Sequence, residues 1–367
     1  MAELAVEGIG LKELTAEQLN ESLVKIDASD NTLTVLPAEI GACVNLEELL
    51  LFANQLKILP KELGALPNLK VLNLFNNKLM KLPVEIGNLA NLEEVNLAAN
   101  KLMMLPDAAM AGWAKVSILS LNDNNLVRLG SLEPLKALTE LRIFSNNLED
   151  MPTLCEECPI EVLEIHKNRI SAIPEDYFGR TPALRRIILS NNMLSTLPAS
   201  IGKCSQLLSL QVSDCKLEKL PSGIVWPLTL ETVFLQGNEG LTELPAELAK
   251  LPAIKRCNLG SASTASVTAE LMSLTLDKPD GIFWDPEGKM LKPEDKPKKE
   301  KPKEKEKTKG GGKPSVSGGR PASPKGGRPA SSSGGKVSTG GSSARGGSPK
   351  RAGSPARKAG GAKPKPK

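Results

Sequence analysis

The chain has 367 residues, with 47 Lys+Arg, 42 Asp+Glu, one His and one Tyr. It contains no apolar run close to the roughly 18 to 20 residues that cross a bilayer. A single His also offers no internal partner set for a Ser-His-Asp arrangement. The composition therefore argues against a membrane-spanning helix and against a hydrolase of that type.

The charge is distributed unevenly along the chain. Residues 291–367 contain 22 Lys+Arg and 5 Asp+Glu, a net of +17, and the remaining 25 and 37 in residues 1–290 give a net of −12. The overall net charge of +5 is therefore the sum of an acidic body and a basic tail.

The opening residues MAELAVEGIGLKEL carry Glu3, Glu7 and Glu13 and no basic segment ahead of an apolar one. They do not resemble a secretion signal. We therefore expect a cytoplasmic protein, with the cytoskeleton, a cilium or the nucleus as alternative locations.

Residues 1–22 are predicted to form an N-terminal cap that covers the first repeat. Thr15 and Gln18 have the spacing of a capping box, which predicts a short helix that continues through Leu19 and Leu23.

Two adjacent 23-residue segments, 46–68 and 69–91, share one pattern of Leu, Asn, Leu-Pro and Gly. In the first, Leu49-Leu50-Leu51 suits an extended strand that points in, out and in. Asn54 follows, and its amide can pair with backbone groups at the turn. Because one unit has no second face to pack on, only its neighbours complete the core.

The pattern continues at a spacing of 22 to 24 residues from Leu23 to Ile254. The turn position is occupied in order by Asn31, Asn54, Asn77, Asn100, Asn124, Asn146, Asn168, Asn192, Cys215 and Asn238. The sequence predicts an α/β solenoid over residues 23–260, a horseshoe with a concave parallel β-sheet, about ten full repeats and a partial one.

The segments LTVLPAEIGACVN, LKILPKELGALPN, LMKLPVEIGNLAN and LSTLPASIGKCSQ follow the pattern L-x-x-L-P-x-x-I-G-x-L-x-N. This pattern resembles the leucine-rich repeat superfamily. It is most similar to the intracellular 23-residue class found in Ras-binding leucine-rich-repeat scaffolds and plant intracellular Ras-group proteins. The resemblance covers about residues 20–260 and implies a curved solenoid that binds other proteins.

Specificity in such a solenoid should come from strand side chains that face outward, since the consensus residues form the core. Leu50, Phe52 and Phe75 fall together on adjacent units and predict an apolar site for a protein partner. A second candidate patch mixes aromatic and charged side chains: Arg142, Phe144, Glu164, His166, Lys167 and Arg186. The alternative is an inert surface, because scattered exposed apolar residues are normal.

The six cysteines are Cys43, Cys155, Cys158, Cys204, Cys215 and Cys257. Only Cys155 and Cys158 are close in sequence, and a zinc site would need two more ligands. We expect reduced thiols, no metal and no cofactor, with metal or redox chemistry at this pair as the alternative. GGGKPS at 310–315 lacks the spacing of a phosphate-binding loop, and no enzymatic activity is predicted.

Residues 261–290 are predicted to close the core as a C-terminal cap, with Leu271, Leu274 and Leu276 as covering residues. Phe283 and Trp284 either fold back on the last repeat or form a short linear motif for a partner.

Residues 291–367 are rich in Lys, Pro, Gly and Ser and contain no aromatic residue. Such a segment buries too little apolar area to offset its ordering entropy, so disorder is predicted. Its positive charge suits a polyanion, namely acidic protein tails, nucleic acid or anionic lipid. A purely solubilising tail is the alternative. Ser323, Ser348 and Ser354 precede Pro and are candidate phosphorylation sites that would lower the positive charge.

These features predict a non-enzymatic adaptor or scaffold for signal transduction, which selects a protein partner on its concave face. The basic tail would raise its local concentration at an anionic surface. The alternatives are a cytoskeletal component of microtubules or axonemes, a factor associated with chromatin or RNA, and a regulatory subunit in a small-GTPase or phosphatase pathway.

Overall fold

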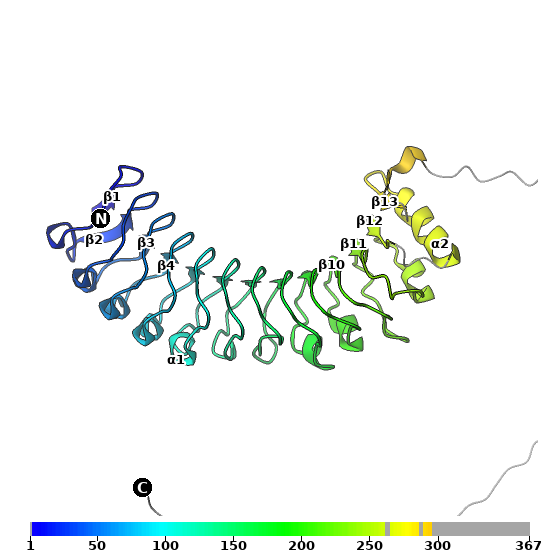
Figure 1. The fold of residues 1–367 in the computed structure, drawn as a ribbon. Helices are drawn as coiled ribbons and strands as arrows, with labels where there is room; N and C mark the ends of the chain where they lie inside the picture. Colours follow the sequence, from blue (N-terminus) through cyan, green and yellow to red (C-terminus); the bar gives the residue numbers. More distant parts are fainter. Residues whose placement is uncertain (1, 261–264, 286–288, 296–367) are drawn as a thin grey trace, which may run out of the picture. The chain divides into compact units, whose positions relative to one another are not determined.

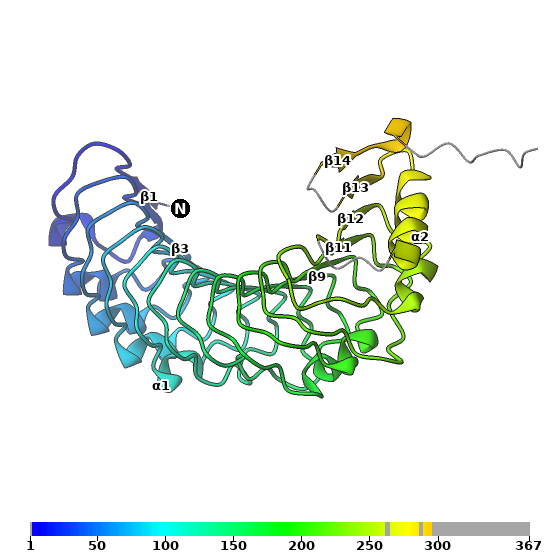
Figure 2. The ribbon, with the colours of Figure 1, turned by 45° about the vertical axis from the view of Figure 1, so that its right-hand side comes forward.

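The structure is a computed structural model that describes residues 2–260, 265–285 and 289–295. The described residues form one sheet of 14 strands, whose order in space follows the order along the chain. The sheet curves into an arc, with the strands on its inner side and short helices on its outer side (Figures 1 and 2). The predicted α/β solenoid with a concave parallel sheet is confirmed. Within this part of the chain no helix has the length and apolarity to span a bilayer.

The strands are short, and most repeat units contribute three residues each. They span Ala2–Ala5 (β1), Leu23–Asp27 (β2), Glu48–Leu50 (β3), Val71–Asn73 (β4), Glu94–Asn96 (β5), Ile118–Ser120 (β6), Glu140–Arg142 (β7), Val162–Glu164 (β8), Arg186–Ile188 (β9), Ser209–Gln211 (β10), Thr232–Phe234 (β11), Arg256–Asn258 (β12), Ile282–Trp284 (β13) and Met290–Leu291 (β14). Successive strands from β1 to β13 pair in parallel, and β14 pairs antiparallel with β13.

Most connections between strands contain a single short helix. The 3-10 helices span Ala16–Gln18, Ala38–Ala42, Lys61–Ala65, Val84–Asn88, Tyr177–Arg180, Ala199–Lys203, Ala246–Lys250 and Pro293–Asp295, and the α-helices span Asp107–Met110 (α1) and Ala265–Leu276 (α2).

The alternation predicted from the sequence places one central side chain of each strand in the core. Leu49 pairs in register with Leu72 and is fully buried, whereas Glu48 and Leu50 on either side face outward. Burial of a large apolar side chain contributes roughly 1.5 to 3 kcal/mol before entropy is subtracted. Since every unit supplies several such side chains to one continuous core, neighbouring units stabilise each other.

Asn side chains connect each unit to its neighbour at the turn that follows the strand. Asn54 Oδ1 accepts the backbone N–H of Leu33 at 2.9 Å, and its Nδ2 donates to the carbonyls of Ala28 at 2.9 Å and Leu51 at 3.1 Å. Asn54 is 7% exposed. Its polar atoms are therefore paired where water is largely excluded, as buried polar groups require.

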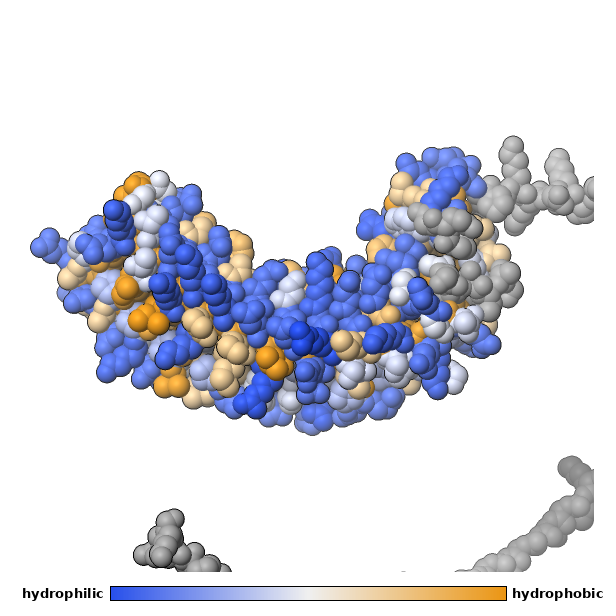
Figure 3. Space-filling model, viewed as in Figure 1, coloured by the Kyte–Doolittle hydropathy of each residue, from blue (hydrophilic) through white to orange (hydrophobic). Residues whose placement is uncertain are grey.

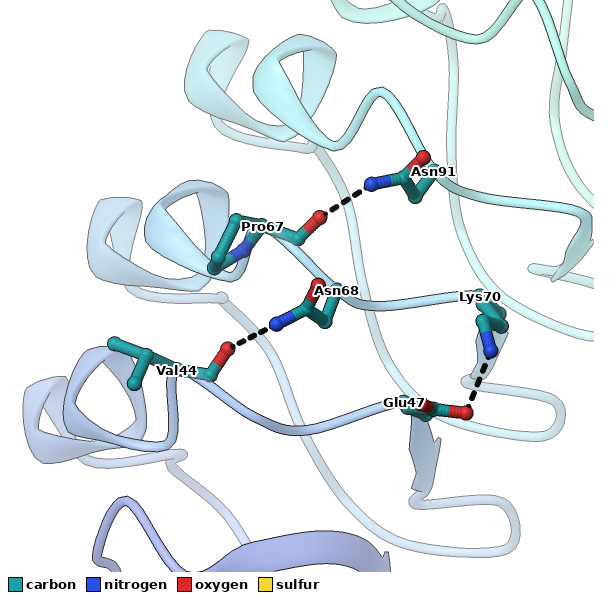
Figure 4. A network of polar contacts seen from close by, with 6 residues as sticks. All are labelled: Val44, Glu47, Pro67, Asn68, Lys70 and Asn91. Atoms are coloured by element: carbon teal, nitrogen blue, oxygen red, sulfur yellow. Dashed lines mark hydrogen bonds and ion pairs between the residues drawn. The ribbon is translucent and has the colours of Figure 1, made fainter.

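A second row of Asn side chains lies ahead of the strands. Asn68 Nδ2 donates to the Val44 carbonyl at 2.9 Å, and Asn91 Nδ2 donates to the Pro67 carbonyl at 2.7 Å (Figure 4). In the same region, Lys70 Nζ lies 2.7 Å from Glu47 Oε2. In these units both ends of the strand are thus tied to the preceding unit, which fixes the positions of the outward side chains.

The N-terminal segment differs from the predicted helix. The capping box is present, with the Thr15 N–H donating to Gln18 Oε1 at 2.9 Å. However, the helix ends at Gln18, and Leu23 begins strand β2, because burial of Leu23 and Ile26 requires extended backbone there. In addition, β1 pairs with β2, so the sheet begins before the first predicted repeat.

The C-terminal segment closes the sheet. Leu271 and Leu276 of α2 are each 2% exposed, and Leu274 packs partly buried against the core. Phe283 is 1% exposed in β13, which pairs with β12, so this segment folds back on the last repeat. The fold continues past residue 290 through β14 to Asp295. Most of the basic tail, with Ser323, Ser348 and Ser354, lies outside the described residues.

Candidate functional site

The candidate site is the concave surface, defined as the outward side chains of the strands and of the second residue after each strand. Adjacent strands of a sheet lie roughly 4.8 Å apart, so equivalent side chains of neighbouring units are direct neighbours. The strands from β2 to β13 are hydrogen-bonded to a neighbour on both sides, which fixes the spacing of these side chains.

The three apolar residues predicted as a partner site are brought together near the N-terminal end. Leu50 and Phe52 are half-buried, and Phe75 is 39% exposed. The Ala53 N–H donates to the Phe75 carbonyl at 2.8 Å, so Phe52 and Phe75 occupy equivalent positions on adjacent units. We define these three residues as the N-terminal patch.

The second predicted patch is also brought together, on β7, β8 and β9. Glu164 lies between two arginines, with its carboxylate 3.8 Å from Arg142 Nε and 3.9 Å from Arg186 Nη1. Arg142 also forms an ion pair with Glu140. The side chain of Glu164 is only 15% exposed, whereas that of Arg186 is 57% exposed. Arg186 therefore retains donors for a partner.

An aromatic stack lies beside this ion network. The rings of Phe144 and His166 have centroids 4.4 Å apart and an interplanar angle of 12°. Burial lowers the pKa of His166, the charge of Lys167 lowers it further, and Asp123 opposes the shift. His166 Nδ1 is buried and has no hydrogen-bond partner among the described residues. We define Arg142, Phe144, Glu164, His166 and Arg186 as the central patch.

A third aromatic group on this surface was not predicted from the sequence. Phe234 of β11 and Trp284 of β13 meet edge to face across β12, with ring centroids 5.5 Å apart and planes at 81°. Phe234 is an outward strand residue by its spacing. The signal for Trp284 was missing because the sequence did not establish that β13 continues the sheet.

The cysteines are all buried free thiols. Burial, with Cys155 beside it, raises the pKa of Cys158 to about 12, and burial raises that of Cys204 to about 12. Protonated, buried thiols are poor nucleophiles and poor metal ligands. In the described part of the chain, no group of three or more His, Cys, Asp or Glu side chains is placed to hold a metal ion.

Comparison with protein families and curated proteins gives local matches. Residues 90–148 and 159–217 match a family described as Leucine rich repeat, and residues 68–89 match a second family of that description. Osteomodulin of Bos taurus is 32% identical over 117 residues, 32% of this chain and 27% of that protein. Fibromodulin of Gallus gallus is 32% identical over 134 residues, 36% of this chain and 34% of that protein. The chain thus spans about a third of the length of the curated relatives it matches.

Solved structures match over more of the chain. YopM, a leucine-rich effector protein from Yersinia pestis, is 30% identical with a TM-score of 0.56, covering 71% of this chain and 66% of that one. A leucine-rich-repeat protein of Leptospira interrogans is 27% identical with a TM-score of 0.51, covering 75% and 81%. The ectodomain of the Arabidopsis receptor kinase HAESA, solved with a peptide hormone ligand, is 26% identical with a TM-score of 0.57, covering 68% and 44%.

These matches correct one prediction and leave another open. Osteomodulin, fibromodulin and lumican, the last 31% identical over 132 residues in Bos taurus, are proteins of the extracellular matrix. The predicted cytoplasmic location is therefore wrong. It was drawn from the first residues of the sequence, whereas location is not encoded in the repeat pattern. The finer resemblance to Ras-binding scaffolds stays a prediction.

Proposed function

Because the chain belongs to the leucine-rich repeat superfamily, we propose that it is a non-enzymatic scaffold that binds a partner protein on its concave surface. The observation that carries this proposal is the central patch, where an aromatic stack and a partly exposed ion network lie side by side on three adjacent strands. The peptide ligand in the HAESA ectodomain structure and the non-enzymatic character of the curated relatives support it.

The central patch has the composition that dominates protein interfaces. Arg and aromatic side chains are enriched among the residues that contribute most to binding. Here the strands hold them in place before a partner arrives, which lowers the entropy lost on binding. Arg186 and Arg142 can donate to a carboxylate, and the Phe144–His166 stack offers a flat apolar surface beside them. A partner segment with an acidic group next to an aromatic or aliphatic side chain would fit both.

The N-terminal patch would extend the same interface. Leu50, Phe52 and Phe75 offer apolar area of the kind that anchors a partner. The proposed interface therefore runs along the inner side of the arc.

The basic tail is proposed to add attraction for a polyanion. Its net charge of +17 over residues 291–367 would release counterions on contact with a polyanion and so give salt-dependent binding. This attraction would raise the local concentration of the concave surface near its partner.

The test is affinity capture from a protein extract with the full chain as bait, followed by mass spectrometry. The two concave variants are Phe52→Ser with Phe75→Ser, and Arg142→Ala with His166→Ala. The matched control is Lys219→Ala, an exposed residue outside the concave surface. We expect discrete partners that the parent and the control retain and that at least one concave variant loses by about tenfold or more, the size of effect typical of interface hot spots.

Two outcomes would contradict the proposal. If the captured proteins are the same for all variants, the concave surface does not select them. If capture disappears at moderate salt for every bait, the attraction comes from the basic tail alone.

A further inference from the structure

A stripe of exposed apolar side chains runs along one flank of the arc, outside the concave surface. Each unit carries two residues between the first Leu after the turn and the Leu-Pro pair, and these two residues face solvent. Six large apolar side chains at these positions are 48% to 61% exposed: Val35, Ile58, Met80, Met103, Met104 and Val127. We define these six residues as the flank stripe. Hydrophobic side chains gather on the N-terminal half of the flank that Figure 3 shows.

The flank stripe is continuous over five consecutive units. Backbone hydrogen bonds place the segments side by side, from Lys78 N–H to the Leu56 carbonyl at 2.9 Å and from Lys101 N–H to the Leu79 carbonyl at 2.9 Å. Further along, the Val127 N–H donates to the Met103 carbonyl at 3.4 Å. The exposed side chains on these segments therefore form one surface rather than scattered points.

The repeat itself does not require apolar residues here. Leu56 and Leu59, which flank the exposed pair in one unit, already supply its core side chains and are buried. In the five later units the equivalent pairs are polar or small: Glu149-Asp150, Ser171-Ala172, Ser195-Thr196, Glu218-Lys219 and Thr242-Glu243. The apolar character of the first five units is thus a local property, as expected for a binding surface.

In these five units, the charged side chains in the exposed pair, and at the residue directly before the first Leu after the turn, are all basic. They are exposed, and in the described structure none of them forms an ion pair: Lys57, Lys78, Lys81, Lys101 and Arg128. Lys78 Nζ donates only to the neutral Gln55 Oε1, at 3.0 Å. An occupant of the stripe would therefore gain from acidic side chains at its edges.

Recesses between units would receive single side chains of an occupant. One, of about 330 Å³, lies between Ile58 and Lys81. Another, of about 230 Å³, lies between Met104 and Arg128 and is also lined by Asp107. The five units of the stripe are separated by four strand spacings of roughly 4.8 Å, which gives a length of about 19 Å along the sheet. A helix of about 13 residues has this length. The Met side chains can adapt to an irregular partner surface.

We propose that the flank stripe docks an acidic amphipathic α-helix of a partner protein. Apolar residues of this helix at i, i+3, i+4 and i+7 would cover the stripe, as in other helix-in-groove complexes, and its acidic residues would face the five cations. A second copy of the chain, related by a two-fold axis, would place these cations against each other. A flat anionic membrane would not enter the recesses.

The proposal is tested with the full chain and a labelled 18-residue peptide that has Leu at i, i+3, i+4 and i+7 and Glu at the flanking positions. A scrambled peptide of the same composition is the control, because the basic tail attracts both peptides equally. Fluorescence anisotropy should give tighter binding of the amphipathic peptide. Ile58→Ser with Met103→Ser should weaken this binding at least tenfold, and Lys81→Glu with Arg128→Glu should weaken it by a similar factor. The matched control Ala172→Ser should leave it unchanged.

The residues substituted in the stripe variants and in the control Ala172→Ser are all exposed, and circular dichroism verifies that every variant folds. Equal binding of both peptides, or binding that the stripe variants do not change, overturns the proposal. So does stripe-dependent sedimentation with phosphatidylserine vesicles instead of peptide binding, or a dimer that Ile58→Ser with Met103→Ser dissociates. Phe52→Ser with Phe75→Ser should not alter peptide binding, which separates this site from the proposed concave function.

Discussion

Phe144 and His166 lie on adjacent units with their ring centroids 4.4 Å apart and nearly parallel planes. They occupy equivalent positions, two residues after β7 and β8, so the stack is a cross-strand contact of the outward sheet face. Burial lowers the pKa of His166, Lys167 adds to this effect and Asp123 opposes it. The folded structure therefore favours the neutral imidazole.

Lowering the pH should destabilise the fold through His166. In the unfolded chain the imidazole has its ordinary pKa of about 6.5, and in the folded chain the pKa is lower. The unfolded state therefore binds more protons, and stability is lost as the pH falls below about 6.5 and through the folded pKa. For one proton the loss cannot exceed about 1.4 kcal/mol per pH unit. Urea unfolding between about pH 7.5 and about pH 5.5 should show this slope.

His166→Gln should lack this pH-dependent component and provides the control. Because the chain has one His, its imidazole NMR resonance reports the folded pKa without further assignment. A measured pKa at or above the ordinary value, or an identical slope in the variant, would show that the folded surroundings of His166 do not favour the neutral ring.

The buried Asn side chains at the turn position form the Asn ladder of the solenoid. Removing one of them should destabilise the fold by about 3 kcal/mol, since each buried group left unpaired costs about 1 to 3 kcal/mol. Asn100 Oδ1 accepts the Leu79 N–H at 2.9 Å, and its Nδ2 donates to the Leu74 carbonyl at 2.9 Å. In Asn100→Ala these backbone groups lose their partners where water is largely excluded. Denaturant unfolding measures the loss, and the exposed Asn125→Ala should change stability by less than about 0.5 kcal/mol. Similar losses in both variants would refute a ladder role.

Placing Asn at position 215, where the other units carry Asn and this chain carries Cys, should stabilise the fold. Cys215 Sγ lies 3.5 Å from the carbonyls of Leu189 and Ser213, so the thiol replaces the donor function of an Asn. The backbone N–H of Leu194 faces the Cys215 sulfur, which is a weaker acceptor than the Oδ1 that an Asn at position 215 would offer by analogy with the other units. Cys215→Asn should add about 0.5 to 1.5 kcal/mol. A lower thermal denaturation midpoint in Cys215→Asn would show that the site cannot accommodate the amide. Cys215→Ala serves as the comparison, because its side chain can neither donate nor accept a hydrogen bond.

The repeat pattern predicted the fold well because each unit places its strand, its turn and its buried side chains at the same offsets in the sequence. Leu49 and Asn54 have fixed offsets, so their inward positions follow from spacing alone. Strand β1 was not predictable in this way, since Ala2–Ala5 lacks the consensus leucines and becomes a strand through its pairing with β2. The predicted location was wrong because it was drawn from the first residues of the chain, and the core repeats do not specify where a solenoid resides.

The sequence predicted which residues of the candidate site are neighbours, but it did not predict the contacts between their side chains. Spacing placed Arg142, Glu164 and Arg186 on neighbouring outward positions, and the structure brings them together. The stacking of Phe144 on His166 depends on side-chain rotamers, which no sequence pattern specifies. The flank stripe was missed because specificity was expected only from strand positions, although Ile58 and Met103 lie between core leucines in the chain.

The helices on the outer side of the arc pack closely at Gly41 and Gly64, which occupy the same position in adjacent repeats. A Cβ at Gly64 would lie 2.1 Å from the Glu85 carbonyl oxygen, whereas a Cβ at Gly41 would lie 3.1 Å from its nearest neighbours on Glu62. Backbone must move in Gly64→Ala, so we expect a loss of about 1 to 3 kcal/mol. In Gly41→Ala a small adjustment suffices, and the lower entropy of the unfolded chain offsets part of the strain. The free energies of unfolding of the two variants should therefore differ by at least about 1 kcal/mol. Equal values would mean that the outer helices separate freely, and the curvature of the arc would then depend on the sheet and the Asn ladder alone.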